Sequence, residues 1–161
     1  MKTYNFYDTS SLLLRAHNLF EQDEYIVISS ITLNELENIK TSTNKDPEIK
    51  FAARHILYLL EQHPEAYEVH IFNTDMLNPI LEKSLSVNED TKILATAINY
   101  DNTKHPDETI FITNDLALSH IANLFFGNEN IEFYEPKPPK IYDGFLTVAF
   151  SDEEMANFYS N

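Results

Sequence analysis

Four acidic residues stand where carboxylates could do chemistry. Asp8 directly follows the strand-like run TYNFY, and Asp115 follows the strand-like run ETIFIT after one intervening residue. Glu35 falls on the same helical stripe as the isoleucines four residues before and after it, and Asp90 heads a second apolar stripe. A carboxylate on an inward-facing stripe is costly unless it is paired or bound to a cation. The pattern therefore points to a site for a hard divalent ion, which prefers oxygen ligands.

Strand-like and helix-like runs alternate along the chain and must position these acids. Strands are predicted at residues 3–7, 25–29, 67–72, 108–113 and 131–134, and helices at 10–20, 29–40, 48–62, 87–100 and 115–126. Such alternation predicts an α/β fold with a parallel sheet between two helix layers. We expect five strands in the order 3-2-1-4-5, which places the strands before Asp8 and Asp115 side by side. Ligands of such sheets bind beyond the carboxyl ends of the strands, where both acids would lie.

The alternation ends at the proline-rich segment EPKPPKIYDG, because proline cannot continue a helix or a central strand. We therefore predict one domain over residues 1–136 and a C-terminal extension or linker over residues 137–161. In this extension, FLTVAF is strand-like, and Ser151 with Glu154 has the spacing of a capping box at the start of a short helix.

Composition and charge exclude several classes of function. The 161 residues contain no cysteine, which excludes disulfides and thiolate chemistry, and only two glycines, which excludes glycine-rich phosphate loops. Asp and Glu number 26 against 11 Lys and Arg, so the formal net charge is −15. This field attracts divalent cations and repels nucleic acids and anionic membranes. No run resembles a signal peptide or a membrane span, so we expect a cytoplasmic protein.

Four segments together resemble the PIN domain, a family of metal-dependent ribonucleases: YDTSSLLL, SSITLNELENIK, NEDTKILATAINY and IFITNDLALSHIA. The resemblance implies hydrolysis of single-stranded RNA at an acidic site that holds one or two Mg²⁺ or Mn²⁺ ions. The catalytic and metal-binding residues that it implies are Asp8, Glu35, Asp90 and Asp115. Ser10 and Thr113 match polar positions of the family and would orient the metal ligands.

Partners are suggested by basic residues and by a narrower resemblance. Lys40, Arg54 and Lys92 are the cations best placed for RNA phosphates, although most exposed cations are plain surface charge. The glutamate-leucine helix, the polar loop after it and the tail IYDGFLTVAFSDEEMANFY are similar to the PIN domain that precedes the ATPase of PhoH-like proteins. This implies a PhoH-like ATPase domain as a partner, in cis or in trans; association with a second copy is left open. Because of the acidic charge, we expect the chain alone to bind RNA weakly and with strong salt dependence.

Each acid also has a simpler interpretation. Asp8 and Asp115 could be helix N-caps, Glu35 could reach solvent at the edge of its stripe, and Asp90 could favour a helix dipole. A non-catalytic PIN-fold module that docks to an ATPase or helicase is the main functional alternative. A phosphoacceptor receiver domain, suggested by FNTDMLNP and Lys137, fits less well because only one acid, Asp8, follows the first strand.

Overall fold

Five parallel strands form the centre of the molecule. The computed structural model describes residues 1–135; the predicted extension, with its strand, its Ser151 capping box and Lys137, lies outside them. The strands are β1 (Thr3–Tyr7), β2 (Ile26–Ser29), β3 (Tyr67–His70), β4 (Glu108–Thr113) and β5 (Ile131–Phe133). They pair in parallel in the order β3-β2-β1-β4-β5, which confirms the predicted topology. Tyr7 pairs with Ile112, so β1 and β4 end at the same edge of the sheet.

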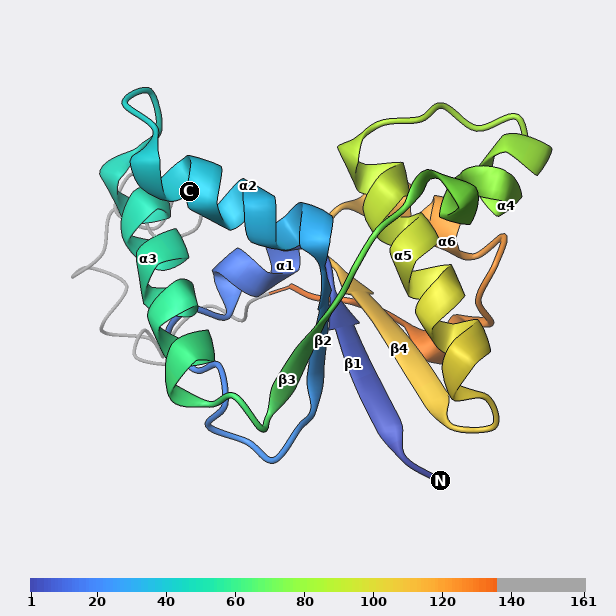
Figure 1. The fold of residues 1–161 in the computed structure, drawn as a ribbon, viewed down its shortest axis with the longest axis horizontal. Coiled ribbons are helices and arrows are strands. Elements are labelled where there is room, and N and C mark those ends of the chain that lie inside the picture. The colour runs from blue at the N-terminus through green and yellow to red at the C-terminus, as the bar shows by residue number, and fades with distance from the viewer. Residues whose placement is uncertain (136–161) are drawn as a thin grey trace, which may run out of the picture.

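Helices cover both faces of this sheet (Figure 1). One layer contains α1 (Thr9–Leu14), α2 (Ser30–Thr41) and α3 (Pro47–Gln62). The other contains α4 (Asn78–Glu82), α5 (Glu89–Lys104) and α6 (Leu116–Ala122), with the short 3-10 helices η1 (Thr74–Leu77) and η2 (Asn128–Asn130) in the connections. The arrangement is the predicted three-layer α/β/α fold. None of the helices within residues 1–135 is long and apolar enough to cross a membrane.

Alternation of side chains along each strand produces two hydrophobic cores. Phe6 and Phe111 pack in the core beneath α5, whereas Tyr7 and Ile112 pack in the core beneath α3. Successive residues of a strand point to opposite faces, which explains this division. Both cores extend to the ends of β1 and β4. The residues that follow these strands are therefore attached to well-packed backbone.

Local differences from the sequence prediction concern short elements. The helix predicted over residues 10–20 ends at Leu14, and turns follow it. Arg15 is buried there and forms an ion pair with Glu24 at 2.8 Å, and Phe20 has a φ of 69°, which a helix does not allow. Helices η1 and α4 lie around Pro79, where no helix was predicted; elements of four and five residues are too short for a clear helical period.

Candidate functional site

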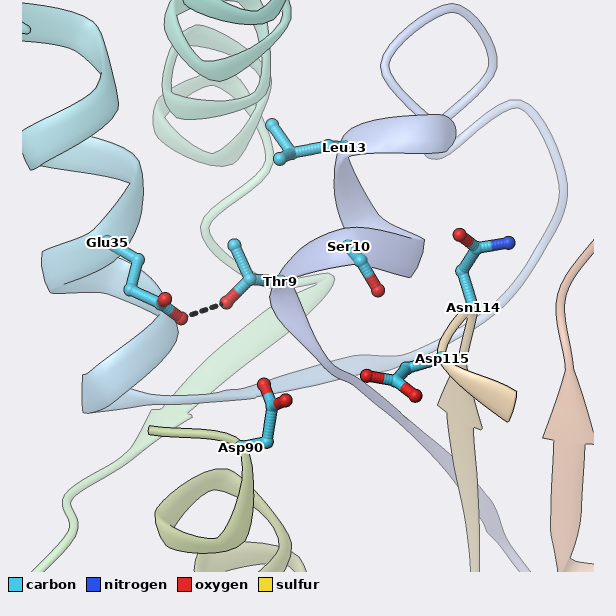
Figure 2. A pocket seen from close by; sticks show the side chains of 7 residues that line it. All are labelled: Thr9, Ser10, Leu13, Glu35, Asp90, Asn114 and Asp115. Atoms are coloured by element: carbon cyan, nitrogen blue, oxygen red, sulfur yellow. Dashed lines mark hydrogen bonds between the residues drawn. The ribbon is translucent and has the colours of Figure 1, made fainter. Parts of the chain in front are cut away.

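A pocket of about 440 Å³ opens at the edge of the sheet where β1 and β4 end. Three acids from three different elements line it: Glu35 from α2, Asp90 from the first turn of α5, and Asp115 before α6. The other lining residues are Thr9, Ser10, Leu13 and Asn114, so none of the seven carries a positive charge. In Figure 2, the carboxylates of Asp90 and Asp115 point into the space beneath Ser10.

Asp8 is buried behind this pocket and does not line it. Only 3% of its surface is exposed. Its carboxylate accepts hydrogen bonds from the Ser11 backbone N–H at 2.9 Å, from the Ser11 hydroxyl at 2.6 Å and from the Thr113 hydroxyl at 2.5 Å. Burial raises the pKa of Asp8, and the hydrogen bonds from Ser11 and Thr113 oppose that rise. Asp8 therefore caps α1 and adds buried negative charge behind the pocket.

The hydroxyls of Thr113 and Ser10 hold the acids in place. Thr113 donates to Asp8 and accepts the backbone N–H of Asp115 at 3.0 Å, so it links the two acids that follow neighbouring strands. Ser10 lines the pocket and its hydroxyl lies 3.2 and 3.3 Å from the two carboxylate oxygens of Asp8. Asp115 in turn accepts the Leu118 N–H at 3.1 Å and caps α6. Both aspartates are thus helix N-caps that also lie at the site.

Glu35 is half-buried at the edge of the apolar stripe of α2, next to the fully buried Leu36. Burial raises its pKa, and so do the negative charges of Glu89, Asp90 and Asp8. The Thr9 hydroxyl opposes this rise because it donates to Glu35 Oε1 at 2.5 Å (Figure 2). The hydrogen bond turns Glu35 toward the pocket and leaves its other oxygen, Oε2, without a hydrogen bond among the described residues.

Asp90 is exposed at the start of α5, so the prediction that it lies on an inward-facing stripe is wrong. The helix start is fixed by a capping box between Asn88 and Thr91. Although the residue as a whole is exposed, the walls of the pocket partly bury its carboxyl group, which raises the pKa of Asp90, and the negative charges of Asp115, Asp8 and Glu89 raise it further. The acids are therefore close enough to repel one another, although each belongs to a different part of the chain.

Two polar lining residues, Thr9 and Asn114, were not among the residues singled out in the sequence. Thr9 positions Glu35, and the Asn114 side chain donates to the Tyr134 carbonyl at 2.9 Å, which ties the end of β4 to the end of β5. The sequence could have indicated both residues, because each is the immediate neighbour of an acid, Asp8 or Asp115, at the end of a strand.

The three predicted RNA-contacting cations lie outside the pocket. Lys40 pairs with Glu37 at 3.3 Å and Lys92 pairs with Glu89 at 3.3 Å. Arg54 is exposed on α3. Their contact with RNA phosphates stays a prediction.

The donor groups of the pocket fit a hydrated hard cation. Among residues 1–135, no three histidine, aspartate or glutamate side chains gather closely enough to hold a metal ion by themselves. Mg²⁺, however, is usually bound through one or two carboxylates and keeps several of its waters. Carboxylate, hydroxyl and amide oxygens surround the pocket, and the pKa values of Glu35 and Asp90 are raised by burial and then by the negative charges of neighbouring carboxylates. This arrangement suits an ion held partly through water, not direct coordination by all four acids.

Comparison with known families gives a match for this chain. A family model for the PIN domain matches residues 6–125, which extend from β1 through α6 and contain all four acids. The chain belongs to the PIN domain family. A search of curated proteins found no match. PIN domains have a nuclease-type fold, so membership confirms the family resemblance and sets aside the receiver-domain alternative, while the narrower PhoH-like resemblance stays a prediction.

Proposed function

We propose that this PIN domain is a Mg²⁺- or Mn²⁺-dependent ribonuclease that hydrolyses phosphodiester bonds of single-stranded RNA. One observation carries the proposal: Glu35, Asp90 and Asp115 converge from three elements on one pocket that no cationic side chain lines. Like charges that raise one another's pKa oppose folding, and a bound divalent ion would offset their repulsion. Family membership supports the nuclease class.

Each residue of the pocket has a role in this proposal. Glu35, Asp90 and Asp115 would hold the ion, and buried Asp8 would add negative charge behind them. When bound, the ion supplies Lewis-acid activation of water and of the scissile phosphate. Glu35 Oε1 accepts the Thr9 hydroxyl, so Glu35 would hold the ion through a water that hydrogen-bonds to Oε2, and Oε2 would take a proton from the attacking water. The water oxygen forms the new bond to phosphorus, the bond to the leaving ribose oxygen breaks, and that oxygen takes a proton from solvent.

We further propose that a PhoH-like ATPase domain, in cis or in trans, delivers RNA to this domain. The net charge of −15 works against capture of RNA from solution, and a partner with a basic surface would offset it. The resemblance of the α2–α3 region to the PIN domain of PhoH-like proteins supports this class of partner.

A non-catalytic docking module is the second candidate, and one observation favours it. Within residues 1–135, no three ligand side chains gather as tightly as in a dry metal centre. A docking module needs the fold but neither metal nor hydrolysis. Metal-dependent cleavage by the purified protein therefore separates the two candidates.

The deciding experiment compares wild type with Asp115→Asn and Asp101→Asn. Asparagine keeps the N-cap of α6, so Asp115→Asn should fold normally. Asp101→Asn removes the same charge from the far part of α5, outside the pocket. We expect wild type and Asp101→Asn to cleave labelled single-stranded RNA in Mg²⁺ or Mn²⁺, and a chelator to stop both. Asp115→Asn should be at least about 100-fold slower, since even groups that only support metal ligands are worth 10–100-fold. If wild type cleaves no faster than Asp115→Asn across many RNA sequences, the docking-module candidate is favoured.

A further inference from the structure

The outer face of α3 carries a ladder of three rings: Phe51, His55 and Tyr58. They are spaced i, i+4 and i+7 and therefore share one side of the helix. The Phe51 and His55 rings lie 5.9 Å apart at 8° to each other, and the His55 and Tyr58 rings lie 6.3 Å apart at 18°. Phe51 is 61% exposed and Tyr58 is 55% exposed.

Packing of the fold does not account for this ladder. α3 is anchored through Ala53, Ile56 and Leu60, which are buried in the core. The two outer rings contribute little to that core, because more than half of each is exposed. Contiguous exposed apolar surface marks an interaction site more often than single exposed residues do.

Cations lie beside the same rings. Over residues 45–58, three cations (Lys45, Lys50 and Arg54) stand against two anions (Asp46 and Glu48), a balance of +1 in a chain of net charge −15. Arg54 lies three residues after Phe51 and four before Tyr58, so its side chain emerges next to both rings. Within residues 1–135, neither Lys50 nor Arg54 forms an ion pair. The segment thus offers rings and cations together, whereas the chain as a whole is acidic.

The ladder belongs to the same helix layer as one wall of the acidic pocket. α3 packs against α2, which carries Glu35, and against α1, which carries Thr9 and Ser10 (Figure 1). The rings and the pocket therefore belong to neighbouring helices of one layer, so RNA that extends from the pocket across α1 and α2 would run toward α3.

We propose that Phe51, His55 and Tyr58, with Lys50 and Arg54, form a track on which bases of single-stranded RNA stack before or after the scissile phosphate enters the acidic pocket. The inference rests on the ribonuclease function proposed above and assigns it a substrate-binding surface. Every base has a face that stacks on aromatic rings, so such a track tolerates any sequence, and adjacent cations contact the phosphates. Stacking depends little on net charge, which explains how an acidic domain would retain RNA.

The test measures RNA binding in the absence of cleavage. The full chain carrying Asp115→Asn is titrated, in chelator and at low salt, into a fluorescent oligoadenylate of about 12 nucleotides. An oligomer of the same length with abasic riboses keeps the phosphates but removes the stacking faces. The ring variants are Phe51→Ala with Tyr58→Ala, and Phe51→Leu with Tyr58→Leu; the control is Leu81→Ala with Leu124→Ala, two side chains of similar exposure elsewhere.

We expect both ring variants to bind oligoadenylate at least about tenfold more weakly than the parent, since each stacked base contributes substantially to affinity. The abasic oligomer should bind to all variants with equal affinity. The control variant, Leu81→Ala with Leu124→Ala, should bind oligoadenylate as tightly as the parent. If the leucine-substituted ring variant binds oligoadenylate like the parent, stacking on the rings does not hold the RNA and the track is overturned. RNA binding that does not depend on the rings, or no measurable binding by the parent, also overturns it.

A cleavage assay with the protein that keeps Asp115 distinguishes failure of the stacking track from failure of the proposed ribonuclease activity. If wild type cleaves RNA while the ring variants bind as tightly as the parent, the ribonuclease stands and the track fails. If wild type never cleaves but binding depends on the rings, the track stands as an RNA-binding surface and the hydrolase fails.

Discussion

Thr113 connects the two acids that follow neighbouring strands, and its removal tests how much that connection matters. The Thr113→Val variant keeps the shape but deletes the hydroxyl that donates to Asp8 and accepts from Asp115. A buried carboxylate that loses a donor costs about 1–3 kcal/mol, so we expect a loss of that size in the free energy of unfolding at neutral pH, measured with urea. The loss should shrink at acid pH, where Asp8 is protonated in both proteins.

Thr103→Val is the control for this prediction. The Thr103 hydroxyl donates only to the Tyr100 carbonyl of its own helix, at 2.7 Å. Its replacement should change the free energy of unfolding by no more than about 0.5 kcal/mol. Equal losses in the two variants would mean that the hydrogen bond from Thr113 to Asp8 contributes no more to the free energy of unfolding than the hydrogen bond of Thr103 within its helix.

At the residue scale, the sequence predicted the acids but not their surroundings. Asp8 and Asp115 could be placed because each follows an apolar strand. The hydrogen bond from Thr113 to Asp8 joins residues 105 positions apart, and no local pattern encodes such a contact. For the same reason the sequence could not show that Asp8 is buried behind the pocket while Glu35 lies in its wall.

Among the elements, α5 carries Asp90 in its first turn, so the start of this helix sets the position of that acid. The Asn88 side chain accepts the Thr91 N–H at 2.9 Å, and the Asn88 backbone N–H donates to the Thr91 hydroxyl at 2.9 Å. The Asn88→Ala variant should lose about 0.5–2 kcal/mol in the free energy of unfolding and should also lower the cleavage rate, because the first turn that carries Asp90 frays.

Two further variants check this explanation by urea unfolding and RNA cleavage. Asn88→Asp keeps a good cap and should retain most of the stability. Asn102→Ala changes an exposed position in the same helix and should cause no loss, since alanine is the better helix former. A destabilisation by Asn102→Ala as large as that by Asn88→Ala would contradict the capping argument.

Elements were predictable from the sequence where hydrophobic periodicity was long. α3 shows its buried stripe of Ala53, Ile56 and Leu60 over sixteen residues, and the predicted helix matched it closely. α1 was predicted too long because its end depends on tertiary contacts: Arg15 turns away from the helix to reach Glu24. The segments around Pro79 were missed because a helix of one turn has no period to detect.

For the whole molecule, the shifted acids predict how stability depends on pH. Asp8, Glu35 and Asp90 have folded pKa values raised above their ordinary values of 3.8, 4.5 and 3.8. The folded state therefore binds protons more tightly than the unfolded state. The stability that comes from this tighter proton binding is fully present at pH values below the unfolded-state pKa values of the three acids. It is lost as the pH rises through their folded-state pKa values.

We therefore expect the free energy of unfolding, measured with urea in chelator, to fall as pH rises from about 4 toward 7. Repulsion among the charges of a chain at −15 acts in the same direction. Saturating Mn²⁺ should flatten this dependence, because the ion favours the ionised carboxylates. Stability in chelator that increases over this range would contradict the raised pKa values.

The three layers followed from the alternation of strands and helices along the chain, because parallel strands need helical crossovers, and the strand order followed once Asp8 and Asp115 were placed on neighbouring strands. The charge of the molecule was equally plain from composition. The position of Lys50 and Arg54 beside the rings of α3 was not, since it depends on which face of that helix is buried.

Thermal unfolding with chelator and with Mn²⁺ tests most directly whether the converging acids form a metal site. Wild type is compared with Asp90→Asn, which removes a pocket charge, and with Asp101→Asn, which removes one from the same helix outside the pocket. At about 100 times its dissociation constant, Mn²⁺ should add roughly 2.7 kcal/mol to the stability of wild type and of Asp101→Asn. Asp90→Asn should be at least as stable as wild type in chelator, because repulsion is relieved, and should gain much less from Mn²⁺. Equal Mn²⁺ shifts in all three proteins would contradict the metal site.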